Sequence, residues 1–501
     1  MKLSTFAGLA VACLLTSSAA GMALAGSLQG TPPDPIATRP ALPTEPREPS
    51  DLLQVFQPAR DRFDAGETVH VSGRLGHGTI AAGRSAKTFV HLDLATDEDL
   101  RAAEAASTNL AIVIDRSRSM KGQRMQNALA AARGMIARLQ DGDTVSVVVY
   151  NTESTVLVPP TRVTAQSRAD LGLQLRTIEA RGHTCISCGV EAGLDLLARG
   201  EGAVSRMLLL SDGQANTGVR DVGGFERLAE RARSRGVSIS SLGVDVDYDE
   251  RLLLAVAQAS NGRHYFVRDP AGLGRVFDEE LQSLQRTVAS DVEAVIDLGP
   301  GIEVTQVFDR AFTRRGRALV VPFGAFAAGD RKSLLLEVQV PRGTEGLREV
   351  ADVKLRYRDL TTDPQSEGAC EGQLAVRLTA DAGAVSPLDP LVETRLARAE
   401  TAAALREANE AFAAGDFAAA QDKIQSTRGR IRRRKADSRK RAPSKSKARI
   451  DFEFDDQFGA LDQADRNFEA AAQAEPAQPF ESPAGRASVR QNADALSGLA
   501  L

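Results

Sequence analysis

The sequence predicts an α/β protein whose central domain is a doubly wound, mostly parallel sheet, inserted in or followed by an all-β domain. Three observations support this fold class. Apolar runs of strand length alternate with stretches of helical period between residues 107 and 287. Strand-like segments without helices lie on both sides of that region, at 52–98 and 288–382. An Ala-rich stretch of helical spacing then predicts a helical segment towards the C-terminus.

The chain has 501 residues, which is too long for a single hydrophobic core and predicts two or three domains. Hydrophobic residues make up 43% and charged residues 26% of the sequence, as in ordinary globular proteins. The formal net charge of -4 favours no particular class of partner.

Residues 1–25 have the layout of a signal peptide, with Lys2, an apolar run and the small residues Ala23-Leu-Ala25. Export to the periplasm, cell envelope or extracellular space is therefore expected. Lipid anchoring at Cys13 is a less favoured alternative, because the apolar run continues past it. No other apolar run reaches the ~18 residues that span a bilayer. Residues 26–51 contain seven prolines and are interpreted as a linker.

Residues 52–106 show strand alternation, as in Phe89-Val-His-Leu-Asp-Leu94. Residues 107–287 are predicted to form the α/β domain, with helices centred near residues 131, 171, 194, 229, 254 and 279. If its strand order is 3-2-1-4-5-6, the first and fourth strands are neighbours where the winding reverses, and a ligand site is expected beyond their carboxyl ends.

Residues 288–382 are predicted to form a β-sandwich-like domain that is completed by the strands before residue 98. Residues 388–427 are interpreted as a helical hairpin, broken at Gly415-Asp416. The basic segment 428–450 is interpreted as a solvated linker, because it lacks the aromatic residues that would favour nucleic-acid binding. Residues 451–501 are expected to be a mostly disordered tail with one amphipathic helix at most.

Oxygen-bearing side chains follow the two most apolar strands. The run Leu110-Ala-Ile-Val-Ile-Asp115 is followed by Ser117 and Ser119, and Met207-Leu-Leu-Leu-Ser is followed by Asp212. Hard cations such as Mg²⁺ prefer oxygen ligands, so this pattern favours a metal site, with helix capping as the alternative for Asp115 and Ser117. No nucleophile or orienting base accompanies the two carboxylates, and catalysis is not predicted.

With Thr184 between them, these residues make the chain resemble a bacterial secreted protein with a von Willebrand factor type A domain. The resemblance covers about 107–287 and implies a metal-ion-dependent adhesion site whose ligands are listed here: Asp115, Ser117, Ser119, Thr184 and Asp212. It implies Mg²⁺, or Mn²⁺ or Ca²⁺, as the cation, and a protein partner that offers an exposed Asp or Glu. Arg118 and His183 stand where the family usually has Gly.

The resemblance leaves two function classes open. One is a binding or adhesion module. The other is an accessory subunit of an enzyme complex, as in metal chelatases, and the export signal favours the first. Arg118 adds a positive charge that could pair with an acid of the partner.

Three cysteines follow the signal segment: Cys185, Cys188 and Cys370. A Cys185–Cys188 disulfide is a candidate in an oxidising compartment, with a redox role at a helix N-terminus as the alternative. The five histidines lack zinc-binding spacing, and zinc usually needs four ligands.

Overall fold

The structure is a computed structural model, and it describes residues 60–103, 107–175, 178–308, 310–362, 365–474, 480 and 482–500. The expected signal peptide at 1–25 and linker at 26–51 lie outside these residues. Within the described part of the chain, no helix is both long enough and apolar enough to cross a membrane.

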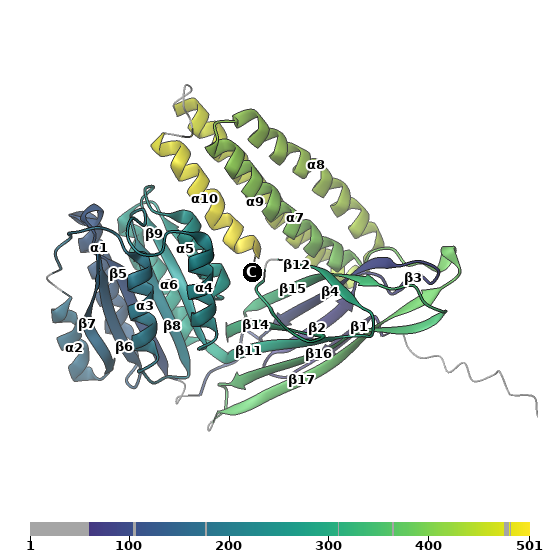
Figure 1. The fold of residues 1–501 in the computed structure, drawn as a ribbon, viewed down its shortest axis with the longest axis horizontal. Helices are drawn as coiled ribbons and strands as arrows, with labels where there is room; N and C mark the ends of the chain where they lie inside the picture. The colour runs from purple at the N-terminus through teal and green to yellow at the C-terminus, as the bar shows by residue number, and fades with distance from the viewer. Residues whose placement is uncertain are drawn as a thin grey trace, which may run out of the picture. The chain divides into compact units, whose positions relative to one another are not determined.

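The central domain contains a six-stranded sheet in the order β10-β9-β8-β5-β6-β7 (Figure 1). Numbered along the domain, this is the 3-2-1-4-5-6 order on which the expected ligand site depends. All pairs are parallel except β6–β7, so the sheet is mixed only at one edge. The strands are β5 (Thr108–Asp115), β6 (Thr144–Tyr150), β7 (Ser154–Arg162), β8 (Val204–Ser211), β9 (Val237–Val244) and β10 (His264–Val267).

Helices cover both faces of this sheet, which is why its central strands are apolar without alternation. In β5, Leu110 and Ile112 pack with α1 and α6, whereas Ala111 and Val113 pack with α3 and α4 on the opposite face. The helices are α1 (Gln123–Arg138), α2 (Ala165–Gln174), α3 (Ile186–Leu197), α4 (Val222–Arg233), α5 (Glu250–Ala259) and α6 (Leu273–Gln285).

The strands before and after this domain build two further sheets, in the orders β1-β2-β4-β15-β12 and β13-β14-β11-β16-β17-β3. Strand β4 pairs along its whole length with β15, so the α/β domain is inserted in the β domain. The two sheets enclose one core, to which Leu92 contributes from one sheet and Val353 from the other. The strands are β1 (Arg62–Ala65), β2 (His70–Leu75), β3 (Thr79–Ala81), β4 (Ala86–Ala95), β11 (Thr287–Leu298), β12 (Glu303–Phe308), β13 (Thr313–Arg315), β14 (Ala318–Ala327), β15 (Arg331–Val340), β16 (Gly346–Asp359) and β17 (Ser366–Thr379).

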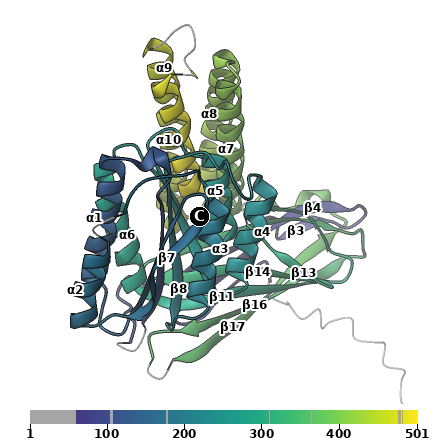
Figure 2. The same cartoon turned by 60° about the vertical axis from the view of Figure 1, so that its left-hand side comes forward.

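Four α-helices follow within the described residues, and α7, α8 and α9 are long neighbours in Figure 2. They are α7 (Pro390–Ala413), α8 (Phe417–Arg441), α9 (Ser444–Ala474) and α10 (Pro483–Ala500). The break between α7 and α8 falls at the predicted Gly415-Asp416. Gly415 has φ +88°, which favours glycine, and the Asp416 carboxylate caps α8 by accepting a hydrogen bond from the Ala419 N–H at 2.9 Å.

The predictions of a basic linker at 428–450 and a mostly disordered tail at 451–501 are wrong, because these residues lie largely in α8, α9 and α10. Cationic side chains of α8 are neutralised by carboxylates of the neighbouring helices, and apolar residues of α9 such as Phe454 and Leu461 are fully buried. The ion pairs join Arg428 to Asp462 and Asp465, Arg434 to Glu400, Lys435 to Asp455, Arg439 to Asp451, and Arg441 to Glu393.

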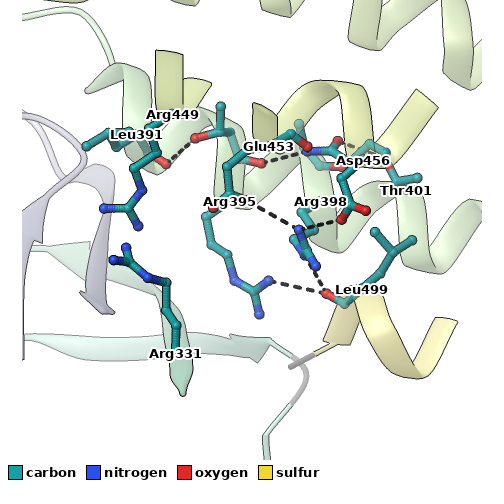
Figure 3. A network of polar contacts seen from close by, with 12 residues as sticks. Arg331, Leu391, Arg395, Arg398, Thr401, Arg449, Glu453, Asp456 and Leu499 are labelled. Carbon is teal, nitrogen blue, oxygen red and sulfur yellow. Dashed lines mark hydrogen bonds and ion pairs between the residues drawn. The ribbon is translucent and has the colours of Figure 1, made fainter. Parts of the chain in front are cut away.

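Helix α10 is held at both of its ends. Near its C-terminus, Arg395 and Arg398 of α7 point to Leu499 and donate hydrogen bonds to its carbonyl oxygen at 3.3 and 2.8 Å (Figure 3). Near its N-terminus, Arg486 forms an ion pair with Asp247 at 3.5 Å, and two turns' length into the helix Arg490 pairs with Glu250 at the start of α5 and donates to the Tyr248 carbonyl at 3.0 Å. Helix α10 therefore connects the helical segment to a loop of the α/β domain.

Candidate metal centre

Two carboxylates lie at the carboxyl ends of the neighbouring strands β5 and β8. Asp115 is the last residue of β5, and Asp212 follows the last residue of β8. The two strands pair in parallel, so both acids reach the same edge of the sheet. Both side chains are fully buried. The fold therefore brings together the two acids that the sequence placed at its expected switch point.

Asp115 is held by hydrogen bonds to both of its carboxyl oxygens. Oδ1 accepts from the backbone N–H of Ser117 at 2.7 Å, and Oδ2 accepts from the Ser211 hydroxyl at 2.8 Å. Burial raises the pKa of Asp115 to about 7 against the opposing effect of these hydrogen bonds, and the neighbouring charge of Asp212 adds to the increase. A nearby cation would stabilise the ionised form of this buried carboxylate.

Hydroxyl groups complete the cluster. Ser117 Oγ and Ser119 Oγ are 3.0 Å apart, and Ser119 Oγ donates to Asp212 Oδ1 at 2.6 Å. A Cβ atom added at Gly213 would lie 3.2 Å from Ser119 Oγ and 3.4 Å from Thr184 Oγ1, so glycine leaves room for both hydroxyls. All five predicted ligand residues are therefore gathered at one place.

These distances fit a small divalent cation. Mg²⁺ holds oxygens at about 2.0–2.1 Å in an octahedron, whose adjacent oxygens are about 2.9 Å apart. The separations of Ser117 from Ser119 and of Ser119 from Asp212 are close to that edge length. Ser117 stands at the N-cap position of the 3-10 helix η1 (Arg118–Met120) but makes no side-chain cap bond, and α1 begins after Gly122 without a side-chain cap. The helix-capping alternative is therefore wrong for the side chains of Asp115 and Ser117. Among the described residues, no group of three or more His, Cys, Asp or Glu could hold a metal, so this site depends on hydroxyl oxygens.

Sequence reasoning missed Arg124, in the first turn of α1. Its guanidinium donates to Asp212 Oδ2 at 3.0 Å and to the Ser119 carbonyl at 3.1 Å, and it forms an ion pair with Asp245. Burial raises the pKa of Asp212, although the hydrogen bonds from Ser119 and Arg124 oppose that increase. No sequence signal marks this contact, because 88 residues separate the partners.

The loop that carries Thr184 is held by hydrogen bonds to two neighbouring loops and by a disulfide of its own. The Thr184 N–H donates to Asn216 Oδ1 at 2.8 Å, and the Cys185 N–H donates to the Asn151 carbonyl at 2.7 Å. Cys185 and Cys188 form a disulfide at the start of α3, as expected, and Cys370 is a free cysteine. The disulfide therefore lies directly beside a candidate metal ligand.

The histidines do not contribute ligands here. His183 is exposed on the threonine loop, where its backbone N–H donates to Thr152 Oγ1 at 3.1 Å. His264 is buried between Ser241 and Tyr248, and burial lowers its pKa to about 3. His91 is also buried, in β4, and His70 lies at the exposed start of β2. The hydrogen bonds of His264 and the burial of His91 support structural roles for these two residues.

Fold and site together define an α/β domain with an oxygen-lined cluster at the switch point of its sheet. Comparison with protein families shows that residues 109–279 match the model of the von Willebrand factor type A domain, so the chain contains a domain of that type.

Curated relatives are found in bacteria and in a mammal. The chain is 25% identical over 290 residues to YfbK of Escherichia coli (strain K12), covering 55% of this chain and 50% of that protein. It is 24% identical over 262 residues to sll0103 of Synechocystis sp., covering 50% and 61%. Inter-alpha-trypsin inhibitor heavy chain H1 of Mesocricetus auratus is 25% identical over 167 residues, covering 31% and 18%. The chain thus spans about half to three fifths of the two bacterial relatives.

Two solved structures share the fold beyond the α/β domain. A von Willebrand factor type A protein from Catenulispora acidiphila superposes with a TM-score of 0.61 at 21% identity, covering 73% of this chain and 89% of that one. The ArnB paralog VWA2 from Sulfolobus acidocaldarius gives 0.58 at 16% identity, covering 85% and 98%. At these identities the likeness concerns the fold alone.

Proposed function

We propose that this chain is an exported binding module that captures an acidic residue of a protein partner through a divalent cation. Asp115, Ser117, Ser119, Thr184 and Asp212 would hold the cation, and we propose binding without catalysis. The observation that carries the proposal is the convergence of two buried carboxylates with the hydroxyls of Ser117 and Ser119, at oxygen–oxygen distances of 2.6 and 3.0 Å. Mg²⁺ is the cation that this spacing favours, with Mn²⁺ and Ca²⁺ as alternatives.

The side chains would leave the cation able to accept a further ligand. Three of the five are neutral hydroxyls, and Arg124 already offsets part of the charge of Asp212. A bound cation supplies a Lewis acid that attracts an external carboxylate. Ser119 is exposed, whereas Asp115, Ser117, Thr184 and Asp212 are buried, so the site opens to solvent at Ser119. An external acid would approach from that side.

We expect Mg²⁺ or Mn²⁺ to raise the melting temperature of the full chain. A ligand that binds only the folded state adds about 2.7 kcal/mol at a hundred times its dissociation constant. Asp115→Ala should abolish this increase, as measured by calorimetry with cation and with EDTA. Asp143→Ala is the matched control: its buried carboxylate accepts from the N–H groups of Thr108 and Gln140, at 2.7 and 2.8 Å. That variant should be less stable but keep its response to cation, and an equal response in Asp115→Ala would show that the cation binds elsewhere.

Partner capture should need both the cation and the hydroxyls. We expect an envelope extract to yield a protein partner on the immobilised chain in Mg²⁺, and to lose it in EDTA. Ser117→Ala in Mg²⁺ should lose it as well, because one hydroxyl ligand is gone. Equal recovery under all three conditions would exclude metal-bridged binding and assign the interaction to another surface.

A further inference from the structure

Four cationic residues lie on the loops that carry the candidate metal ligands, and none of them forms an ion pair within the described part of the chain. Arg116 and Arg118 lie on the loop between the ligands of β5, Lys121 follows the same loop, and Arg181 precedes Thr184. We call these four residues the basic rim. Among the described residues, none of the four forms an ion pair within 4.0 Å, although Glu153 and Glu179 lie on neighbouring segments. The rim therefore carries charge that the fold does not neutralise.

The backbone fixes the rim against the site. The Arg181 N–H donates to the Arg116 carbonyl at 2.7 Å, and the Arg118 N–H donates to the Gly182 carbonyl at 3.4 Å. The threonine loop is thereby joined to the loop that carries Ser117 and Ser119. Arg118 is exposed between those two serines, so its charge lies beside the open side of the site.

Arg116 and Arg181 form an unfavourable pair in the isolated chain. A backbone hydrogen bond joins the two residues, so their positive charges lie on adjoining segments of the two loops. Arg116 donates to Thr155 Oγ1 at 3.0 Å, but its buried Nε atom has no hydrogen-bond partner in the described structure. Two like charges with an unused buried donor are stabilised when an anion is supplied from outside.

We propose that the basic rim binds a second carboxylate of the partner, so that the site selects acidic segments with paired acids rather than a single exposed acid. This inference rests on the proposed function, in which the first acid binds the cation. An extended chain advances about 3.3–3.6 Å per residue, and Arg116 and Arg118 each adjoin a ligand. The second acid is therefore expected within about three residues of the first. The loops 115–124, 179–188 and 212–221 contain no Phe, Tyr or Trp on which bases could stack, which favours a protein partner over a nucleic acid.

The test uses the full chain and two labelled peptides of twelve residues, one with a Glu-Ser-Glu centre and one with Glu-Ser-Gln. Binding of each is measured by fluorescence anisotropy in Mg²⁺ and in EDTA. The wild type should bind the paired-acid peptide about three- to tenfold more tightly than the single-acid peptide. This preference should fall with added salt, because exposed charges are screened.

Arg116→Gln/Arg181→Gln should reduce the preference to about twofold or less. Arg199→Gln/Arg235→Gln removes the same net charge from exposed positions after α3 and α4, and should leave the preference unchanged. An unchanged preference in the rim variant, or an equal loss in the control variant, would overturn the proposal. A single-stranded oligonucleotide that competes as well as the paired-acid peptide would overturn the assignment to a protein partner.

The cation's role is decided separately. If the single-acid peptide binds equally in Mg²⁺ and EDTA, metal-bridged capture is excluded. The comparison of wild type with the rim variant then still shows whether the basic rim binds the second carboxylate. If the single-acid peptide needs Mg²⁺ but the paired-acid peptide binds no more tightly, the proposed function is supported and the role of the basic rim is excluded.

Discussion

Replacing Glu280 by leucine should lower the free energy of unfolding of the α/β domain by about 3–5 kcal/mol, because it leaves a buried positive charge without its partner. Glu280 of α6 is 1% exposed and accepts from Arg206 of β8 at 2.7 Å and from the Tyr265 hydroxyl at 2.8 Å. Burial disfavours the ionised form of Glu280, but Arg206 and Tyr265 outweigh it and keep its pKa below the ordinary value.

The double variant Arg206→Met/Glu280→Leu distinguishes the cost of leaving one buried charge unpaired from the contribution of the ion pair itself. Removing both charges leaves no unpaired group, so most of the lost stability should return. Hydrogen-exchange mass spectrometry of peptides from β8 and α6 reports on this domain alone. A loss below about 1 kcal/mol for Glu280→Leu would mean that water already solvates Arg206.

The pH dependence of this effect has a definite sign. A lowered folded-state pKa contributes stability that is fully present above the unfolded value of about 4.3. That contribution is lost as the pH falls through the lower folded-state pKa. The difference between wild type and Glu280→Leu should therefore be constant near neutral pH and shrink in acid.

Phe468→Ala should destabilise the helical segment by about 3–5 kcal/mol, the usual cost of a buried phenylalanine. Phe468 of α9 is fully buried and stacks on Phe412 of α7, with ring centroids 4.4 Å apart and planes at 16°. Truncation removes this aromatic contact and leaves a cavity between two helices.

Phe452→Ala is the matched control, because this side chain lies on the same helix and is 72% exposed. Its effect should stay within about 0.5 kcal/mol. Urea unfolding with hydrogen-exchange readout on α7 and α9 compares the two variants. Equal effects of the two truncations would contradict the docking of α9 on α7.

The sequence predicted those parts of the fold that depend on local pattern. Strand β5 is apolar along its length because both of its faces are covered, and Asp115 stands out as the residue that ends it. The same holds for β8 and Asp212. The alternation of strands and helices predicted a parallel sheet covered on both faces but not its strand order, and the ligand set followed from the family resemblance.

Contacts between distant charges could not be predicted in this way. Arg428 lies 34 residues from Asp462, and a window around either residue shows only an excess of one charge. The basic segment therefore resembled a solvated linker until α9 supplied its acids. Arg124 was missed for the same reason, because its contact with Asp212 appears only when α1 packs beside the end of β8.

The insertion of the α/β domain determines how mechanical force would pass through the molecule. On the N-terminal side, the Ala103 N–H donates to the Leu360 carbonyl at 2.7 Å. On the C-terminal side, α6 leads directly into β11, a twelve-residue strand paired with β14 on one side and β16 on the other. Hydrogen bonds in such a ladder lie across the strands. Tension along β11 therefore shears many bonds together instead of opening them one by one, and the second connection shares the tension.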